Sequence, residues 1–461
     1  MSIKAAYMLP HPPIIVPEIG RGEEQKIVST MNAYHETARR IALEKPQTIV
    51  LITPHQVMYA DYFHISPGKS AKGDLGKFGA PQVHMEVQYD TAFTERLCLL
   101  AAEKQIPAGM EGERNKSLDH GTMVPLYFVN QYWQAYKLVR IGLSGLPLTM
   151  HYALGECIQE AADALGRNVI VIASGDLSHR LKEDGPYGYQ EEGPAYDHRI
   201  MDVMARGAFR ELFEFPESFC EKALECGHRS FTMMAGALDK TGTTAEKLSY
   251  EGTFGVGYGI CCYQAGANAS ERNFREQYEE QERKRLAIQR ENEDVYVRLA
   301  RQTIETYIRT GDRIKVPEGL PVEMNARAAG VFVSLKENGA LRGCIGTIQA
   351  TSPCIAEEII QNAISAATKD PRFMPIMEEE LDKLVISVDV LGETERIESP
   401  DELDVRRFGV IVTKGHKRGL LLPNLDGIDT VEEQIAIAKN KAGIGKDQEV
   451  ELERFEVIRH F

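Results

Sequence analysis

The sequence predicts a layered α/β domain followed by a smaller α+β domain, joined by a charged helix. Over roughly the first 265 residues, short apolar runs rich in β-branched residues alternate with helical patterns, which is typical of layered α/β folds with a parallel or mixed sheet. After Ala269 the composition changes to a stretch dense in both charges that lacks Pro and Gly. Such a charge pattern indicates a solvated helix between domains.

The elements of the first domain follow from this alternation. The predicted strands are Ala5–Leu9, Thr48–Thr53, Lys137–Leu143, Asn168–Ala173 and a closing strand Tyr258–Tyr263. The predicted helices are Glu23–Glu44, Thr91–Glu103 and Thr149–Leu165.

The second domain begins where apolar periodicity returns, at Asp294–Tyr307. Its further predicted elements are strands at Ala329–Leu335, Leu384–Leu391 and Gly409–Thr413, and helices at Ile355–Lys369 and Val431–Ala442. The expected domain boundaries are therefore 1–268, 269–292 for the linker, and 293–461.

Composition excludes several classes of protein. The 461 residues carry 53 Lys and Arg against 68 Asp and Glu, a net charge of -15, so a nucleic-acid-binding surface is not expected. No apolar run is long enough to cross a membrane and no secretion signal is visible, which predicts a cytoplasmic protein with no membrane association. Eight cysteines without a CxxC pair indicate reduced thiols.

The histidines locate the predicted chemistry, because ten of the twelve precede residue 230. His11 and His55 each follow a predicted strand, and His179 follows a third through a turn of small residues. Sites in open α/β sheets form beyond the carboxyl ends of the strands. Three strands that each end near an imidazole are therefore expected to converge on one site.

A single histidine after a strand is weak evidence for a metal site, but the repetition favours one. The DHGTMVPL segment adds Asp119 and His120. Neutral imidazole binds Fe, Zn, Cu and Ni, and two histidines with one carboxylate suit Fe(II) oxygen chemistry. Five other histidines lie in helical or polar contexts and are predicted to have no site role: His35, His64, His84, His151 and His198.

These segments resemble a known family. LPHPP near the N-terminus, TPH ending at His55, LDHGTMVPL around His120 and SGDLSH ending at His179 are similar to LigB-type class III extradiol dioxygenases and the related Memo family, over roughly residues 1 to 265. The resemblance implies that His11 and His55 bind Fe(II), with Zn as the alternative metal. It also implies that His120 and His179 form the pair that moves protons and orients a small aromatic substrate.

The third metal ligand is predicted from the same resemblance. The family places a carboxylate, or in Memo-like members a cysteine, shortly before the last core strand. Glu251 in SYEGTFGVGYG is the expected ligand, with an exposed turn acid as its plain alternative. Cys226, in ECGHRSF, is the second candidate. Asp176 is predicted either to fix a turn or to orient an imidazole.

The second domain resembles the AMMECR family. The resemblance depends on LRGCIG (Leu341–Gly346), KDPRF (Lys369–Phe373) and GLLLPN (Gly419–Asn424), in that order. The family context implies operation beside a Memo-like protein and a radical SAM enzyme. Cys344, with Arg342 two residues away, has two open readings: a reactive thiolate, or a packed thiol with Arg342 paired to a carboxylate.

Three functions remain open from the sequence. The first is an extradiol-type Fe(II) dioxygenase acting on a catecholic or similar small aromatic. The second is a metal-binding partner or scaffold of a radical SAM system that does not turn over dioxygen. The third, Zn-dependent hydrolysis, fits the His120 and His179 pair less well. A homo-oligomer is possible by analogy with such folds.

Overall fold

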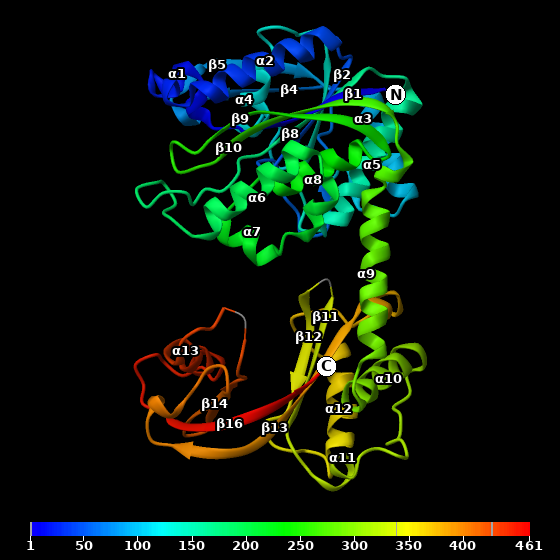
Figure 1. Ribbon diagram of the computed structural model, residues 1–461, viewed down its shortest axis with the longest axis vertical. Helices are drawn as coiled ribbons and strands as arrows, with labels where there is room; N and C mark the ends of the chain where they lie inside the picture. Colours follow the sequence, from blue (N-terminus) through cyan, green and yellow to red (C-terminus); the bar gives the residue numbers. More distant parts are fainter. Residues whose placement is uncertain (1, 338, 426) are drawn as a thin grey trace. The chain divides into compact units, whose positions relative to one another are not determined.

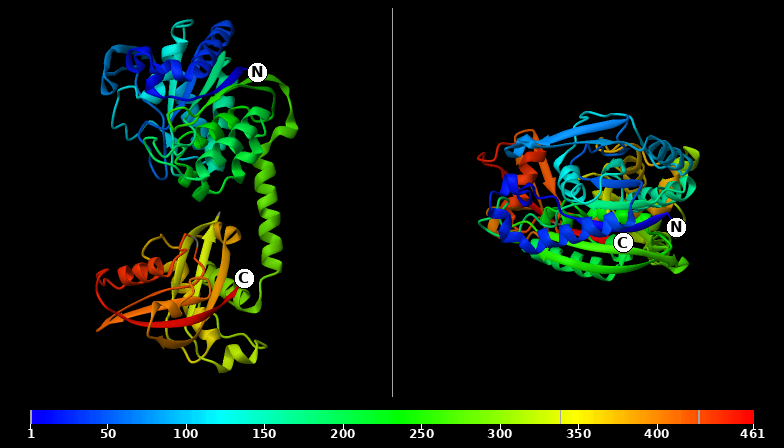
Figure 2. Two further views of the ribbon diagram at one scale, coloured as in Figure 1. Left: turned by 60° about the vertical axis from the view of Figure 1, so that its left-hand side comes forward. Right: turned by 90° about the horizontal axis from the view of Figure 1, so that it is seen from above.

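The computed structural model describes residues 2–337, 339–425 and 427–461. The chain forms two compact units, Met1–Glu280 and Gln281–Phe461. Each unit has its own six-stranded sheet, which can be followed in Figures 1 and 2, and its own hydrophobic cores. The predicted fold class, a layered α/β domain followed by an α+β domain, is confirmed.

A six-stranded mixed sheet forms the centre of the N-terminal unit, in the order β7-β2-β8-β1-β10-β9. The first four strands in this order are parallel, while β10 is antiparallel to β1 and β9 is antiparallel to β10. The bounds are β1 (Ile3–Leu9), β2 (Thr48–Thr53), β7 (Lys137–Gly142), β8 (Val169–Ser174), β9 (Thr241–Glu251) and β10 (Tyr258–Asn268). The five strands expected from the sequence are present, and β9 is an addition.

Both faces of this sheet are buried, which explains why its strands are almost continuously apolar. In β1, Ala6 and Met8 belong to one core, whereas Tyr7 and Leu9 belong to the other. Helices cover both faces (Figure 1). The first core includes α3 (Thr91–Glu103), α5 (Leu148–Leu165), α6 (Glu192–Arg206) and α8 (His228–Ala237), and the second α2 (Val28–Glu44) and α4 (His120–Val129).

A hairpin that the sequence analysis did not predict lies between β2 and α3. It consists of β4 (Ser70–Leu75) and β5 (Ala80–Gln88), joined by a short turn at Gly76–Phe78. Its strands are short of β-branched residues and rich in polar ones, so their apolar pattern is weak. Two very short strands, β3 (Phe63–His64) and β6 (Ala108–Gly109), pair nearby.

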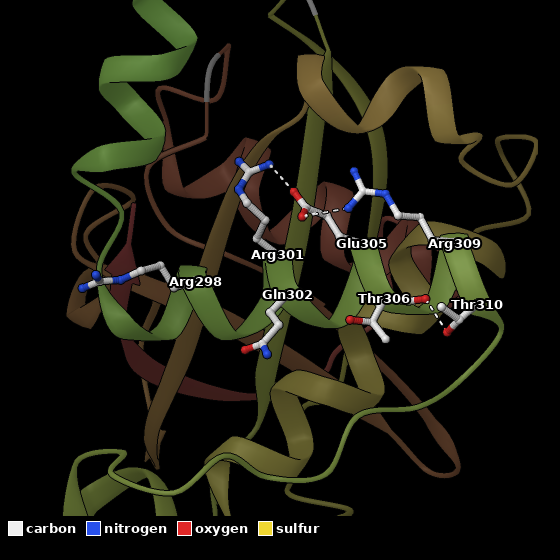
Figure 3. Close-up of a pocket in the computed structure, with 7 residues that line it drawn as sticks. All are labelled: Arg298, Arg301, Gln302, Glu305, Thr306, Arg309 and Thr310. Atoms are coloured by element: carbon white, nitrogen blue, oxygen red, sulfur yellow. Dashed lines mark hydrogen bonds and ion pairs between the residues drawn. The ribbon is translucent and has the colours of Figure 1, made fainter.

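The predicted charged helix is α9 (Phe274–Glu291), which has no buried residue among those described. The next helix, α10 (Val295–Thr310), packs into the C-terminal core. Its exposed face borders a hollow of about 350 Å³, and ion pairs one turn apart link Glu305 to Arg301 and to Arg309 (Figure 3). Such i,i+4 pairs stabilise a helix by a few tenths of a kcal/mol each.

The C-terminal unit contains a curved antiparallel sheet in the order β12-β11-β13-β16-β14-β15 (Figure 1). Helix α12 (Ile355–Thr368) packs with α10 on the larger core, and α13 (Val431–Lys441) covers a smaller one. The short α11 (Val322–Ala326) also contacts α12. The strands are β11 (Val331–Glu337), β12 (Ala340–Gly346), β13 (Val385–Ile397), β14 (Phe408–Lys414), β15 (Lys417–Leu421) and β16 (Glu451–His460).

Strands β12, β15 and β16 were not among the predicted elements: β12 has a weak apolar pattern with two glycines and Arg342, β15 is short, and β16 is rich in charged residues. Over the residues that the structure describes, no helix combines the length and the apolar character needed to span a bilayer.

Candidate metal centre

Three neighbouring parallel strands carry polar residues to one edge of the N-terminal sheet. His11, His55 and Asp176 each lie two residues beyond the last residue of β1, β2 and β8. These strands are adjacent in the order β2-β8-β1. The strand ends that carry His11 and His55 therefore lie at one edge of the sheet as expected, whereas His179, the third expected imidazole, lies five residues beyond the end of β8.

Two imidazoles and one thiol form the core of the cluster. The Nε2 atoms of His11 and His55 are 2.9 Å apart, and the Sγ of Cys226 is 3.6 Å from the Nε2 of His11. The ligand atoms of these three residues all lie within 4.8 Å of one another. Among the described residues, this is the group of histidine, cysteine and acidic side chains whose spacing fits a metal ion.

The hydrogen bonds of His11 fix which of its nitrogens is free. The Ser174 hydroxyl donates to the carbonyl oxygen of Gly121 at 2.6 Å, so its oxygen accepts from Nδ1–H of His11 at 2.9 Å. Nε2 therefore keeps its lone pair. Burial, and then the neighbouring His55, lower the pKa of His11 well below its ordinary value, so the imidazole is neutral. A neutral imidazole with one N–H anchored is the form that binds metals.

The backbone at His55 is held by the hydroxyl of Thr53, which is itself bonded to the carboxylate of Asp119. The backbone N–H of His55 donates to the Oγ1 of Thr53 at 3.2 Å, and this hydroxyl donates to Asp119 at 2.7 Å. Asp119 also accepts from the N–H of Thr122 at 2.9 Å and so caps α4, the helix that begins at His120. One carboxylate thus links the end of β2 to the start of α4.

Cys226 lies in the turn between α7 (Glu217–Ala223) and α8. The backbone N–H of Asp176 donates to its sulfur at 3.3 Å, while the N–H of Cys226 donates to the carbonyl of Asp176 at 3.4 Å. Burial, followed by the charges of Asp176 and Glu225, raises the pKa of the thiol well above its ordinary value. A thiolate at this position therefore requires a cation, which a bound metal supplies.

Of the roles that the sequence left open for Asp176, the structure shows the one that fixes the backbone, and no hydrogen bond joins its carboxylate to an imidazole among the described residues. Its carboxylate accepts from the backbone N–H of His11 at 2.7 Å, which fixes the chain beyond β1, and its other oxygen lies 3.9 Å from the Nε2 of His11. Burial raises its pKa to about 6. It therefore orients the chain at His11 and faces the cluster as well.

His120 and His179, the predicted proton-moving pair, differ in their relation to the cluster. The ring of His120 lies 4.0 Å from that of His55 and 5.3 Å from that of His11, measured between centroids. Burial and the two neighbouring imidazoles lower its pKa to about 3. The ring of His179 packs edge-on against Tyr187 at 5.3 Å, and its buried Nδ1 has no partner among the described atoms.

Glu251 is engaged elsewhere. Its carboxylate accepts from both the backbone N–H and the hydroxyl of Thr30, at 2.7 and 2.6 Å, near the start of α2. The structure therefore brings Cys226 to the two histidines, and it places Glu251 at the end of β9 in an anchoring contact with α2. Cys226, the second candidate, is the third donor that the geometry supports.

A cavity of about 430 Å³ opens beside the cluster. His55, Asp119 and His120 form one wall, and the turn of the β4–β5 hairpin forms another through Lys77 and Phe78. The ring of Phe78 lies 5.1 Å from that of His120. This volume is within the usual range for small-molecule sites. The remaining lining residues are Gly73, Asp74, Leu75, Asn115, Ser117 and Leu118.

Sequence reasoning missed the residues that orient the site. Ser174 is the last residue of an apolar strand, and Gly121 follows a histidine, so neither position has a distinctive pattern. A Cβ at Gly121 would lie 2.6 Å from the hydroxyl of Thr53, which explains why glycine is needed there. Lys77 and Phe78 belong to the hairpin that was not predicted.

The donor set fits a resident transition metal. Two neutral imidazole nitrogens face one sulfur within bonding reach of a common centre. His11 and Cys226 also have anchoring contacts of the kind that orient metal ligands. The five histidines predicted to have no site role are not part of this group of ligand atoms.

Comparison with known proteins gives matches to both units. Residues 5–261 match the family described as the catalytic LigB subunit of aromatic ring-opening dioxygenase, and residues 297–460 match the AMMECR1 family. A protein of Clostridium acetobutylicum is 43% identical over 474 residues, covering 100% of this chain and 99% of that protein. A Thermotoga maritima protein is 52% identical over 170 residues, which is 36% of this chain and 98% of its own length.

Two solved structures of uncharacterised proteins are similar to parts of this chain. An uncharacterised Pyrococcus horikoshii protein is 39% identical, with a TM-score of 0.34, over 36% of this chain and 88% of its own. An uncharacterised Escherichia coli K12 protein is 16% identical, with a TM-score of 0.38, over 56% of this chain and 99% of its own.

Proposed function

This chain belongs to the LigB family and carries an AMMECR1 domain behind its LigB domain, and from that premise we propose that its N-terminal unit is an Fe(II)-dependent extradiol-type dioxygenase. His11, His55 and Cys226 would hold the metal. The substrate would be a catechol or related small aromatic. The observation that carries the proposal is the convergence of His11, His55 and Cys226, with His120 beside them and with His55 and His120 lining the adjacent cavity.

The residues of the chain divide the work at this site. When bound, Fe(II) would supply a centre that binds both a diol and dioxygen. The cavity admits a ring between the hairpin turn and the wall formed by His55 and His120. His120 is neutral at physiological pH because its pKa is lowered to about 3, so it orients substrate oxygens by hydrogen bonding and carries no charge.

His179 is the proposed acid/base. Its buried Nδ1 has no protein partner among the described atoms, so a substrate hydroxyl that reaches this nitrogen would be its hydrogen-bond partner and the source of the proton that it moves. The edge contact with Tyr187 limits the rotation of the ring. Its backbone is fixed as well, since its N–H donates to the carbonyl of Ala223 at 3.2 Å.

The test is anaerobic reconstitution with Fe(II), metal analysis, and oxygen uptake with a panel of catechols. We expect about one iron per chain, and His11→Ala should lose it. His179→Ala should keep the iron and lose most oxygen uptake, since general acid/base groups contribute about 10²–10⁴-fold. His198→Ala, on the exposed face of α6, is the matched control and should change neither quantity. Full uptake by His179→Ala would exclude the acid/base assignment.

A second candidate function has a specific observation in its favour, the thiol of Cys226 where dioxygenases use a carboxylate. A metal-binding partner of a radical SAM enzyme would need the ligands but not oxygen turnover. Iron binding without oxygen uptake on any catechol, together with a stable complex with a purified radical SAM enzyme, would favour this function. Turnover by the isolated chain would count against it.

A further inference from the structure

A fully buried arginine, which the proposed function does not use, lies behind the wall of the cavity. Arg140 is in β7, where its neighbours Val139 and Ile141 both belong to a hydrophobic core, and only 1% of the residue is exposed. Burying a guanidinium is costly unless its N–H groups and its charge are compensated. The partners of Arg140 are therefore the groups that make this burial possible.

One end of the guanidinium is connected to the residue that follows His55. The Nε of Arg140 donates to the hydroxyl of Ser66 at 2.7 Å. The same hydroxyl accepts from the side-chain amide of Gln56, also at 2.7 Å, and Gln56 is the next residue after His55. The backbone N–H of Ser66 donates to the carbonyl of Arg140 at 2.9 Å as well, so this connection has two points of attachment on β7.

The other end of the guanidinium holds the segment that leads into His120. Its Nη1 donates to the carbonyl of Ser117 at 2.9 Å and lies 3.6 Å from the carboxylate of Asp119. Both of these residues line the cavity. The side chains of the ion pair are only 1% and 12% exposed, so solvent and salt screen their attraction little. The planar fork of Arg140 thus reaches both flanks of the cavity wall.

Asp119 connects Arg140 to the two histidines of this wall. Its carboxylate accepts from the hydroxyl of Thr53, and that hydroxyl accepts from the backbone N–H of His55. The same carboxylate caps α4, the helix that begins at His120. A displacement of Asp119 therefore changes the backbone position at both His55 and His120.

We propose that Arg140 is a positioning residue, which acts through Asp119 to fix the metal ligand His55 and the neighbouring His120. This inference rests on the metal centre of the proposed function, but it does not depend on dioxygen turnover. Loss of a partner that orients a metal ligand lowers metal affinity by about 10–100-fold. A purely structural role of Arg140 would lower stability and leave the affinity of the folded chain unchanged.

The test is a double-mutant cycle on the full chain, in which Zn(II) affinity is measured by competition with a chelating indicator. Arg140→Met and Asp119→Asn should each weaken Zn(II) binding about 10–100-fold. Arg140→Met made in the Asp119→Asn background should cost no more than about threefold further, because the two residues act as one unit. The proposal is overturned if Arg140→Met has the same effect in both backgrounds, or has none.

Arg140→Lys keeps the test decisive if Arg140→Met does not fold. The ammonium retains the charge beside Asp119 but loses the fork that also holds Ser66 and Ser117. We expect a folded chain that binds Zn(II) about tenfold more weakly, the lower end of the range for such partners. Its Co(II) complex should show shifted d–d absorption, because the position of His55 changes. An unchanged affinity together with an unchanged Co(II) spectrum would overturn the proposal.

Two arginines in other parts of the chain are matched controls. Arg275→Met removes two bonds of 3.0 Å to Glu156 within the same unit. Arg342→Met removes the bonds to Glu380 at 2.7 and 3.1 Å, the carboxylate pairing that was one of the two interpretations of LRGCIG. Both variants should lower the denaturation midpoint and leave Zn(II) affinity and the Co(II) spectrum unchanged, and an equal loss of affinity in these controls would contradict the proposal.

The measurements also separate this proposal from the dioxygenase function, because binding of Zn(II) and Co(II) requires no dioxygen. A chain that binds metal with the expected coupling between Arg140 and Asp119 but consumes no oxygen would refute the dioxygenase function and support the positioning role. A wild-type chain that binds neither metal would overturn both.

Discussion

Removing the thiol of Cys226 is the sharpest test of the metal centre. Cys226→Ala deletes one of three donor atoms that lie within 4.8 Å of one another, without changing the contacts of His11 with Ser174. Zinc-finger sites bind their metal with roughly 10–16 kcal/mol, shared among four ligands, so one ligand contributes about 3 kcal/mol. Because 1.4 kcal/mol is tenfold in Kd, the variant should bind the metal at least about 100-fold more weakly.

Glu251→Gln is the matched comparison, because it alters the other candidate ligand. Its carboxylate accepts from the N–H and the hydroxyl of Thr30. Replacing charged by neutral acceptors at two hydrogen bonds should lower the free energy of unfolding by about 1–2 kcal/mol. Metal affinity should stay unchanged. Cys226→Ala should therefore lower the metal affinity, whereas Glu251→Gln should lower the free energy of unfolding and leave the metal affinity unchanged.

The assay is anaerobic titration with Fe(II) in the presence of a chelating indicator, run beside chemical denaturation. Thiolate ligation of Co(II), used as a spectroscopic substitute, should also give a near-ultraviolet charge-transfer band that Cys226→Ala loses. Cys98→Ser, a half-buried thiol on α3, controls for the general effect of losing a cysteine. Full metal affinity in Cys226→Ala together with a large loss in Glu251→Gln would refute the reasoning and restore the carboxylate.

Three further predictions follow from individual contacts. Gly121→Ala should lower the free energy of unfolding by about 1–3 kcal/mol in chemical denaturation, because its Cβ would meet a hydroxyl at 2.6 Å. Ser174→Ala should weaken metal binding about 10–100-fold in a titration, because His11 loses the acceptor that fixes its tautomer. Arg372 holds the pKa of Asp370 below its ordinary value, so the ionised carboxylate stabilises the fold above about pH 4 and this contribution disappears as the pH falls. The stability difference between wild type and Asp370→Asn should therefore shrink between pH 7 and about pH 3, and a constant difference would exclude this linkage.

The sequence predicted those parts of the fold whose apolar pattern is strong, either as a continuous apolar run or as a helical period. Strands buried on both faces read as continuous apolar runs, and their ends could be placed within a few residues. Because parallel strands share an edge, this also placed His11 and His55 together. The β4–β5 hairpin was missed because its alternation is weak, and with it the cavity wall at Lys77 and Phe78.

The third ligand could not be derived in the same way, because loops have no periodicity. Cys226 lies in a turn between two helices, and its approach to His11 depends on mutual backbone contacts with Asp176 that no pattern announces. Glu251 has the expected residue type and lies before the last core strand. Its carboxylate nevertheless accepts from the amide and the hydroxyl of Thr30, and that amide lies in the first turn of α2, where backbone N–H groups have no partner within the helix.

The cysteine donor also affects which metal the site binds when Fe(II) and Zn(II) compete for it. Thiolate and carboxylate carry the same charge, so the net charge of a divalent site is unchanged, but sulfur is the softer ligand and favours Zn(II) more than oxygen does. Affinities of divalent ions for a common site already rise from Fe(II) to Zn(II). We therefore expect Zn(II) to displace Fe(II) from the wild-type chain. Oxygen uptake, if the dioxygenase proposal holds, should then fall in proportion to the iron lost, as measured by metal analysis on the same samples. Retention of Fe(II) against equimolar Zn(II) would contradict a site with one thiolate and two imidazoles.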